Sequence, residues 1–537
     1  MRRLLALTSL PALGLASLAL AGCSSEAANV ITIDEAPLEY VPEGKADDYR
    51  STTGKEYALL ARDTIVLEGD ELLLEGEART ARVQELVELR FKAISFFAYE
   101  YLAGKSRSDA NFTYGNFRTT IRQQTFETLA MVERPDAPGT FDFDFEAEAG
   151  GPNDLMQKVP ISAASTFPLA VPILTRDELE SGSYAKTYKA FNAETVAADK
   201  LQTLDVAISA KSSEPDAYPN YTAFFEDGVL DVAIHVGGDY NEERYDLVAA
   251  RDIFDRLQSD LGLTAPVSDF DALRTNSGPF KGTLDANGRT ISVEVTLIHP
   301  DMNKESGVGY EGLIALYKAS AAKADIVMYD GHAGYDVSYS GIVVHYNPRH
   351  AIAAADFADL ELPAKYQLFV FNGCKTYTSY ADAMYKNRAK TVANLDIITT
   401  VNFSWLSEMT RVTTDLIGNF TATNKSEHIP RSYDQVLAEL NSGRSWDVIY
   451  GVHGLSDNAR LSPYADTATL CATCNGHAEC PGADNLCIKG LGGVAGCAAA
   501  CTDDTGCPEG YRCGAVAAGG SNLLSGRQCV PTTGRCE

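Results

Sequence analysis

The chain has 537 residues, of which 73 are acidic and 45 basic, so its formal net charge is -28 at pH 7. This length suffices for about three domains, and the composition is that of an ordinary globular protein. An acidic surface repels phosphate backbones, which excludes nucleic acid as the expected partner.

The first residues are typical of an exported protein. Two arginines precede an apolar stretch over 4–21, which is the build of a signal peptide rather than of a membrane span. The stretch ends in LAGC (20–23), which resembles the bacterial lipoprotein box. In that motif the cysteine is lipidated and becomes the mature N-terminus. The resemblance implies that residues 1–23 are a lipoprotein signal peptide and that Cys23 is the lipidation site.

We therefore expect a cell-envelope lipoprotein, held at the outer membrane or cell surface by its N-terminal lipid. The sequence contains no second apolar span, so the lipid is the expected membrane contact. The alternative is an ordinary secretory signal that happens to contain a cysteine. Residues 24–55 are small, polar and charged, which predicts a flexible tether.

Residues 56–215 are predicted to form an α+β domain of unknown role. The segment 64–77 (TIVLEGDELLLEGE) favours two short strands around a turn, and 80–102 has apolar residues at helical spacing. The segment 141–148 (FDFDFEAE) alternates phenylalanine with acids, which is typical of a half-buried strand. A structural calcium ion on these acids is an alternative, although one strand face does not make several oxygens converge.

A polar, proline-marked break at 210–221 precedes a domain at 225–465 in which strands and helices alternate. The predicted strands are 228–238, 289–299, 324–330, 366–372 and 395–405, and the predicted helices are 246–262, 310–323 and 378–388. Runs that are apolar on both faces, between amphipathic helices, predict a mostly parallel sheet covered on both sides. Ligands of such sheets gather at the carboxyl ends of the strands.

Cysteine usage divides the 12 cysteines into three groups. One is Cys23, one is Cys374, and ten lie in a C-terminal module at 470–537. An even number in an oxidising compartment predicts up to five disulfides in a module too small to fold on an apolar core. These ten are Cys471, Cys474, Cys480, Cys487, Cys497, Cys501, Cys507, Cys513, Cys529 and Cys536.

Within this module, 474–487 and 501–513 share one spacing of cysteines. The segment resembles the cysteine-rich modules found at the ends of many exported myxobacterial proteins. The C-x-x-C pair of Cys471 and Cys474 leaves zinc binding as an alternative.

The remaining thiol, Cys374, follows the predicted strand 366–372, and His332 follows the strand 324–330 in the same way. If these strands are neighbours, both side chains emerge at one edge of the sheet. This pair suits cysteine nucleophilic catalysis, in which a thiolate attacks and a histidine holds and then donates the proton. The predicted helix 378–388 would place Cys374 near a helix N-terminus, whose partial positive charge favours the thiolate.

The segments 324–336 (ADIVMYDGHAGYD) and 366–377 (YQLFVFNGCKTY) resemble the signature of the caspase-like cysteine peptidases, the group of caspases, gingipains, legumains and clostripain. In that group an apolar strand ends in a His-Gly turn, and a later apolar strand ends in the catalytic cysteine. The resemblance covers residues 225–465. It implies a caspase-like α/β/α sandwich, a polypeptide substrate, and neither a cofactor nor a catalytic metal.

By this resemblance, His332 would be the general base and acid and Cys374 the nucleophile. The backbone N–H groups of Ala333 and Cys374 would be the oxyanion donors. The chain departs from the family pattern at two positions. Ala333 stands where glycine usually follows the histidine, and Gly373 stands where alanine or serine often precedes the cysteine.

The resemblance also suggests a substrate pocket. In caspase-like peptidases an aromatic side chain beyond the cysteine walls the pocket for the residue before the scissile bond, and Trp405 occupies this region. Glu408 or Asp336 would supply a charge there. The alternative is that Trp405 belongs to the core.

Other histidines compete with His332. His235, His299 and His453 lie in or near predicted strands, where a lone histidine is more often a core or surface residue than a catalyst. His345 and His350 could join His332 in a metal site, but the spacings between these histidines match no strong metal-binding motif.

The sequence therefore predicts a lipid-anchored, exported cysteine endopeptidase with a Cys-His dyad. One alternative is a catalytically inactive caspase-like lipoprotein that serves in binding or adhesion. Another is an unrelated α/β domain in which Cys374 is merely buried.

Overall fold

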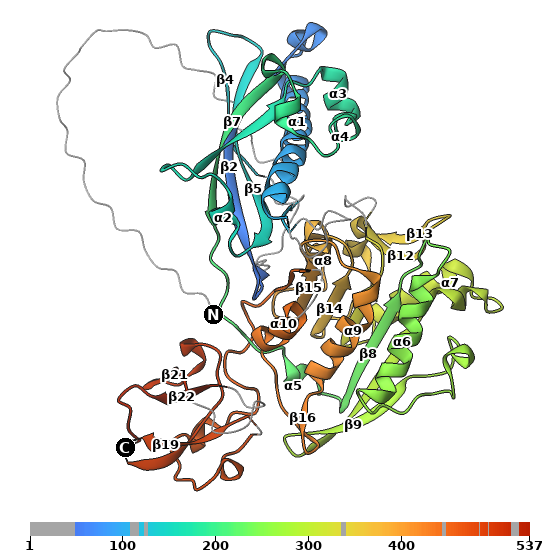
Figure 1. Cartoon of the computed structure of the whole chain (residues 1–537), viewed down its shortest axis with the longest axis vertical. Helices are drawn as coiled ribbons and strands as arrows, with labels where there is room; N and C mark the ends of the chain where they lie inside the picture. The colour runs from blue at the N-terminus through green and yellow to red at the C-terminus, as the bar shows by residue number, and fades with distance from the viewer. Residues whose placement is uncertain are drawn as a thin grey trace, which may run out of the picture.

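The computed structural model of the chain describes residues 49–107, 118–122, 127–333, 340–442, 447–482, 484–491, 493–516 and 526–536. Figure 1 shows an N-terminal unit with one long helix, a central α/β unit and a small C-terminal unit. The predicted signal peptide, Cys23 and most of the predicted tether lie outside the described residues. Across the part that is described, no helix combines the length and the apolar character needed to span a membrane.

The N-terminal unit is a sheet in the order β3-β5-β2-β7-β6, with β4 also paired to β5. Its strands are β2 (Gly54–Val66), β3 (Thr120–Ile121), β4 (Glu127–Glu133), β5 (Thr140–Pro152), β6 (Thr166–Pro172) and β7 (Leu201–Ala210). Its helices are α1 (Gly76–Lys105), α2 (Leu155–Lys158), α3 (Arg176–Ser181) and α4 (Tyr184–Thr187). The apolar face of α1 is buried against the sheet, as its spacing predicts.

Strand β5 confirms the alternation seen in the sequence. Phe141, Phe143 and Phe145 are buried, whereas the acids between them lie on the other face. Asp142 pairs with Arg134 and Asp144 with Arg62, both at 2.6 Å. These carboxylates are thus held by one arginine of the neighbouring strand β2 and one that directly follows β4.

The predicted pair of strands at 64–77 is wrong in its second half. Strand β2 continues to Val66, and Gly69–Leu73 then forms a 3-10 helix that leads into α1. The cause is a capping box, in which the Glu71 carboxylate accepts the backbone N–H of Glu68 at 2.8 Å.

The α/β unit contains a ten-stranded sheet in the order β1-β18-β15-β14-β11-β8-β10-β9-β17-β16. Its strands are β1 (Tyr49–Arg50), β8 (Val229–Val236), β9 (Phe280–Ala286), β10 (Arg289–Ile298), β11 (Ile326–Asp330), β14 (Gln367–Asn372), β15 (Leu395–Thr400), β16 (Thr423–Asn424), β17 (Glu427–His428) and β18 (Tyr450–His453). The five strands from β10 to β15 are parallel, and β9 and β18 flank them in antiparallel pairing. The sheet is therefore mixed, with a parallel centre.

Helices cover this sheet and a hairpin lies beside it (Figure 1). The helices are α5 (Tyr221–Phe224), α6 (Tyr245–Ser259), α7 (Gly309–Ala321), α8 (Tyr380–Tyr385), α9 (Leu406–Phe420) and α10 (Tyr433–Asn441), and the hairpin is β12 (Gly341–His345) with β13 (His350–Ala353). Helix α9 packs between α6 and α10, and α7 packs against the hairpin. The central strands are buried throughout, which fits their apolar sequences.

The first described strand, β1, belongs to the α/β sheet and not to the N-terminal unit that follows it. Tyr49 pairs with His453 of β18, and its ring packs edge-on against Tyr377 at a centroid distance of 5.2 Å. Only 2% of Tyr49 is exposed. Strand β1 thus lies within the predicted tether of residues 24–55, so the prediction is wrong for residues 49–55, where burial of this aromatic ring anchors the chain.

The interface between the N-terminal unit and the α/β unit contains a buried arginine. Arg122 is 1% exposed and pairs with Asp382 of α8, and it lies 3.4 Å from both Glu56 and Glu148. The hydroxyl of Tyr377 donates to Glu56 at 2.7 Å. The N-terminal unit is therefore fixed to the segment that follows Cys374.

The C-terminal unit is rich in disulfides, as predicted. It contains two hairpins, β19 (Leu486–Leu491) with β20 (Val494–Ala498) and β21 (Tyr511–Ala515) with β22 (Arg527–Pro531). Its disulfides are Cys471–Cys536, Cys474–Cys487, Cys480–Cys497, Cys501–Cys513 and Cys507–Cys529. The C-x-x-C pair is divided between two disulfides, so the zinc alternative is wrong.

Candidate functional site

Three parallel strands end side by side at one edge of the large sheet. β11 lies between β8 and β14, and Asp330 at its end is in register with Val236 of β8 and Asn372 of β14. Each strand is followed within three residues by a side chain that can take part in chemistry. These are Asp239, His332 and Cys374.

Gly373 explains how closely two of these turns approach. A Cβ atom on Gly373 would lie 2.8 Å from the carbonyl oxygen of Gly331 and 3.2 Å from the Cβ of Ala333. The first of these distances is shorter than real Cβ contacts, and it is to a backbone atom, so a side chain here would force the two turns apart. The departure from the family pattern at Gly373 is therefore a packing requirement of this turn pair, which brings the Cys374 backbone against the turn of His332.

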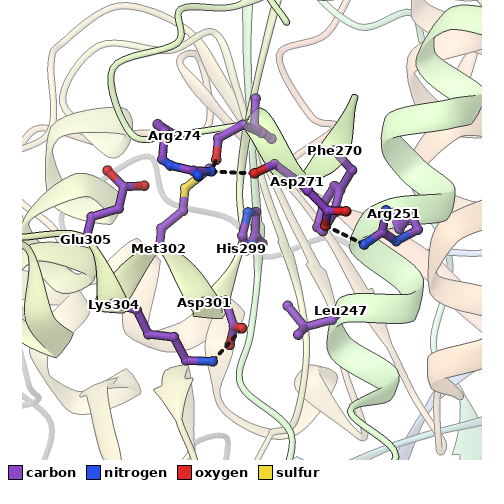
Figure 2. A pocket seen from close by; sticks show the side chains of 11 residues that line it. Leu247, Arg251, Phe270, Asp271, Arg274, His299, Asp301, Met302, Lys304 and Glu305 are labelled. Carbon is purple, nitrogen blue, oxygen red and sulfur yellow. Dashed lines mark hydrogen bonds and ion pairs between the residues drawn. The ribbon is translucent and has the colours of Figure 1, made fainter. Parts of the chain in front are cut away.

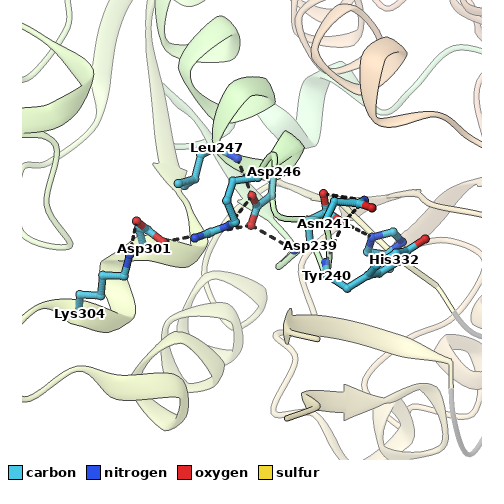
Figure 3. Close-up of polar contacts among 9 residues, drawn as sticks. Asp239, Tyr240, Asn241, Asp246, Leu247, Asp301, Lys304 and His332 are labelled. Carbon is cyan, nitrogen blue, oxygen red and sulfur yellow. Dashed lines mark hydrogen bonds and ion pairs between the residues drawn. The ribbon is translucent and has the colours of Figure 1, made fainter. Parts of the chain in front are cut away.

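The imidazole of His332 is bound to a carboxylate. Its Nε2 lies 2.9 Å from Oδ1 of Asp239, whose side chain is fully buried (Figure 3). Because the carboxylate accepts the Nε2–H, this contact favours the tautomer in which Nδ1 carries the free lone pair. His332 is thereby oriented as a base.

The charge of Asp239 is stabilised locally. Burial raises the pKa of this carboxyl, but hydrogen bonds from His332 and from the Asn241 side chain outweigh it and hold the pKa below the ordinary value. The Asn241 Nδ2 donates to both carboxylate oxygens, at 2.8 and 3.0 Å. Asp239 is therefore an anion in position to stabilise a protonated His332.

Sequence reasoning did not identify Asp239. The signal was present, because Asp239 directly follows two glycines at the end of the predicted strand 228–238. The order of the strands in the sheet was missing, and only that order places β8 beside β11.

Three tyrosines hold His332 in place. The hydroxyl of Tyr329 donates to the backbone carbonyl of His332 at 2.7 Å and accepts the N–H of Val343 at 3.0 Å. The ring of Tyr240 stacks on the imidazole at a centroid distance of 4.8 Å, and Tyr346 lies at 5.2 Å. Both the backbone and the ring plane of His332 are thus fixed.

Cys374 is half-buried, and its thiol donates to the backbone carbonyl of Ser404 at 3.4 Å. Burial raises the pKa of the thiol above its ordinary value, and the positive charge of Lys375 acts in the opposite direction. The thiol is therefore protonated at neutral pH in this structure.

The predicted helix 378–388 is shorter and begins later than expected. Lys375 takes a left-handed conformation with φ of 57°, and a 3-10 turn at Thr376–Thr378 precedes α8. A left-handed residue interrupts the helical path. The predicted lowering of the thiol pKa by a helix N-terminus is wrong, because burial of the thiol dominates.

A backbone N–H group can serve as an oxyanion donor only if it is not already used in another hydrogen bond. Among the residues that the structure describes, the backbone N–H groups of Ala333 and Cys374 donate to no acceptor, whereas the next amide, of Lys375, donates to the carbonyl of Asn402 at 3.0 Å. Within the described residues, no acceptor therefore competes with a developing oxyanion for these two N–H groups.

Lys375 connects the Cys374 turn to the N-terminal unit. Its Nζ lies 3.9 Å from the ring centroid of Tyr99 in α1 and 4.9 Å from that of Phe403, and it donates to the Tyr99 hydroxyl. Burial lowers the pKa of Lys375 to about 8. The residue beside the thiol is thus a buried amine clamped by a helix from another unit.

The predicted substrate pocket is described only in part. Trp405 is half-buried and lies directly between Ser404 and the start of α9. Glu408 lies within α9, but its side chain is outside the described residues. Asp336 also lies outside them.

Most of the other histidines are structural. His235 is buried and bonds to the Ser320 hydroxyl at 2.9 Å, and burial lowers its pKa to about 3. His453 is buried and bonds to Thr399 at 2.9 Å. The rings of His345 and His350 both pack on Tyr310, and their centroids lie 6.2 Å apart.

His299 lines a cavity of about 340 Å³ beyond the end of β10 (Figure 2). Its ring packs on Phe270, and within the described chain neither ring nitrogen has a hydrogen-bond partner. Burial lowers its pKa to about 4, so the ring is neutral. Asp301 and Lys304 form another wall of this cavity, which includes neither His332 nor Cys374.

The chain was compared with family models, with curated proteins and with solved structures. No family model matches the chain, and no curated protein matches it. A solved structure entitled "Structure of Protease" is similar with 14% sequence identity and a TM-score of 0.26. The match covers 53% of this chain and spans 62% of the length of that one.

Proposed function

We propose that the chain is an exported cysteine endopeptidase of the caspase-like type. The observation that carries this proposal is the hydrogen bond between His332 and the buried Asp239, at the same sheet edge as Cys374. A nucleophile, a base and a group that orients the base are the parts that nucleophilic catalysis requires. The resemblance of segments 324–336 and 366–377 to caspase-like peptidases supports the same assignment.

In the proposed reaction, the Nδ1 of His332 takes the proton of Cys374, and the sulfur attacks the carbonyl carbon of the scissile peptide bond. A C–S bond forms, and the N–H groups of Ala333 and Cys374 stabilise the oxyanion. His332 returns the proton to the leaving amine as the C–N bond breaks. A water molecule then attacks the thioester carbon, and His332 takes its proton. As the C–S bond breaks, His332 gives this proton to the sulfur, which restores the thiol and releases the second product as a carboxylic acid.

Asp239 would stabilise the imidazolium ion that forms in both halves of this reaction. Because Asp239 is buried and its pKa is lowered, it would remain an anion while His332 carries the proton. The proposal therefore assigns three groups to the reaction where the sequence predicts only a dyad.

One observation favours a second candidate, a catalytically silent binding or adhesion lipoprotein. The thiol of Cys374 donates to the Ser404 carbonyl, and its pKa is raised. A thiol in this state is a weak nucleophile. The peptidase requires that substrate binding releases the sulfur from Ser404.

Cleavage of a peptide library separates the two candidates. The mature protein would be incubated with the library beside the Cys374→Ala and His332→Ala variants, and the products identified by mass spectrometry. His350→Ala serves as a control, because the ring of that histidine packs on Tyr310, which has no role in the proposed reaction. We expect cleavage by the wild type and the control only. Absence of cleavage by a folded wild type, with peptides retained on the protein, would support the binding lipoprotein.

We also propose that Cys23 carries a lipid and that the protein lies at the cell envelope. The support is the resemblance of residues 20–23 to the lipoprotein box. Metabolic labelling with a radioactive fatty acid, followed by membrane fractionation, tests this. We expect label and membrane association in the wild type and neither in Cys23→Ser. A released, unlabelled wild-type protein would indicate an ordinary secretory signal.

A further inference from the structure

Asp246, in the first turn of α6, is a buried carboxylate that the proposed reaction does not use. It is 0% exposed. Its Oδ1 accepts the Nε–H of Arg244 at 3.0 Å and the backbone N–H of Leu247 at 2.8 Å. Its Oδ2 accepts an Nη2–H of Arg244 at 3.0 Å and the backbone N–H of Asp239 at 3.1 Å. Both oxygens are thus satisfied, and one of their donors is the backbone of the residue that holds His332.

Arg244 supplies the counter-charge for this buried anion. It has a left-handed backbone with φ of 51°, which is uncommon for a residue with a side chain. Its guanidinium binds Asp246 through two nitrogens and reaches Asp301 at 2.9 Å. Arg244 therefore neutralises Asp246 without competing for Asp239.

Figure 3 shows that these contacts form one chain of residues, from Lys304 and Asp301 to Asp246 and on to His332. Several groups restrain Asp239, among them His332 and the backbone N–H of Tyr240, which donates to its carboxylate at 2.8 Å. The Asn241 side chain binds its carboxylate, and Asp246 binds its backbone. The Asp246 contact ties the backbone of this turn to the first turn of α6, whereas the N–H groups of Gly237 and Gly238 tie it to Asp330 and Val343.

We infer that Asp246 is a positioning residue, which acts on His332 through Asp239. It fixes the Asp239 backbone so that the carboxylate meets the Nε2–H of His332. Asp246 touches neither His332 nor Cys374, so its effect depends wholly on Asp239. The kinetic test of this inference rests on the proposed function. The spectroscopic test does not, because it reports the tautomer of His332 whether or not the protein cleaves peptides.

A kinetic double-mutant cycle tests the inference. We expect Asp246→Asn to lower kcat by about 10- to 100-fold with little change in KM, because it misplaces the base without altering substrate contacts. Asp252→Asn is the control, since this acid lies on the same helix and pairs with Arg256 at 3.1 Å on the surface. The Asp239→Asn, Asp246→Asn double variant should be no slower than Asp239→Asn alone. Multiplied losses would overturn the inference, because they would mean that Asp246 acts by another route.

NMR of protein labelled with 15N-histidine reports the tautomer of His332 directly, so this test does not require that the protein is an active enzyme. The His332 signal, identified by its loss in His332→Gln, should show the Nε2–H tautomer in the wild type and in Asp252→Asn. In Asp246→Asn it should shift toward the Nδ1–H tautomer, which we also expect Asp239→Asn to favour. An unchanged tautomer in Asp246→Asn would overturn the inference even if the protein cleaves peptides. A changed tautomer in a protein that cleaves nothing would reject the peptidase proposal alone.

A second variant covers the case in which Asp246→Asn does not fold. Arg244→Lys retains the positive charge but loses the two-pronged contact with Asp246. We expect it to shift the His332 tautomer in the same direction, by less. A folded Arg244→Lys protein with the wild-type tautomer would also count against the inference.

Discussion

The Nε2 of His332 lies 2.9 Å from Oδ1 of Asp239, a carboxylate with no exposed surface. If the proposed reaction is right, Asp239→Asn should reduce kcat by about 10²- to 10⁴-fold, because the amide cannot stabilise the imidazolium and favours the wrong tautomer. Initial rates on the peptide selected from the library would measure this. A fall of less than about threefold would remove Asp239 from the mechanism. Circular dichroism would verify that the variant is folded.

The raised pKa of the Cys374 thiol predicts slow alkylation at neutral pH. A thiolate reacts and a thiol does not, so the iodoacetamide rate should climb with pH and reach half its maximum above the free-thiol value of about 8.5. Cys374→Ser gives the background, since the structure pairs the cysteines of the C-terminal unit in disulfides. A rate that is high and constant between pH 6 and 9 would instead indicate a thiolate stabilised by a protonated His332.

Asp330, just before the Gly331–His332 turn, should make stability depend on pH. Burial raises its pKa to about 7, with hydrogen bonds from Thr413 and Asn372 acting in the opposite direction. Between about pH 4 and 7 the folded state therefore holds a proton that the unfolded state has released. The contribution of Asp330 to the free energy of unfolding therefore falls as the pH rises from about 4 to 7. Above about pH 7 this contribution no longer changes with pH.

Asp330→Asn imitates the neutral carboxyl group, so it should lack this dependence. Relative to wild type, the variant should gain about 1.4 kcal/mol in its free energy of unfolding per pH unit between about pH 4 and 7, and about 4 kcal/mol at most. Urea unfolding of both proteins at several pH values would measure the difference. A difference that does not change with pH would show that Asp330 titrates normally.

Arg122 should be essential for docking of the N-terminal unit. Its replacement by methionine leaves Asp382, Glu56 and Glu148 without their arginine, and removal of one partner from a buried ion pair costs about 3–5 kcal/mol. Arg134→Met is the matched control, because its pair with Asp142 is exposed and should matter little. Denaturant unfolding would compare the two. Equal stability of both variants would mean that the interface does not depend on this charge.

The sequence predicted much of the α/β unit because its signals are local. Apolar runs that end in glycine mark β8, β11 and β14, and the helical spacing over 246–262 and 310–323 marks α6 and α7. His332 and Cys374 were predicted as site residues because each comes just after such a run. That they share one edge of the sheet follows from the parallel pairing of β11 with β14, which the sequence alone does not give.

What the sequence did not reveal depends on contacts between distant segments. Asp239 and Asp246 could not be assigned without the order of the strands and the path of the turn before α6. The raised pKa of Cys374 depends on burial, which no local pattern reports. The disulfide partners likewise follow from the folded module and not from cysteine spacing.

The pairing of β1 with β18 has a consequence for how this chain folds. The strand that completes the edge of the α/β sheet precedes the whole N-terminal unit, while its partner is among the last segments of that domain to leave the ribosome. Tyr49 can pair only after His453 has been synthesised. Formation of the complete sheet therefore closes a long loop that contains all of the chain between these two residues. A fragment that starts at residue 225 would leave the backbone of β18 open to pairing between molecules. We therefore expect the two larger units to fold as one and the isolated α/β fragment to aggregate.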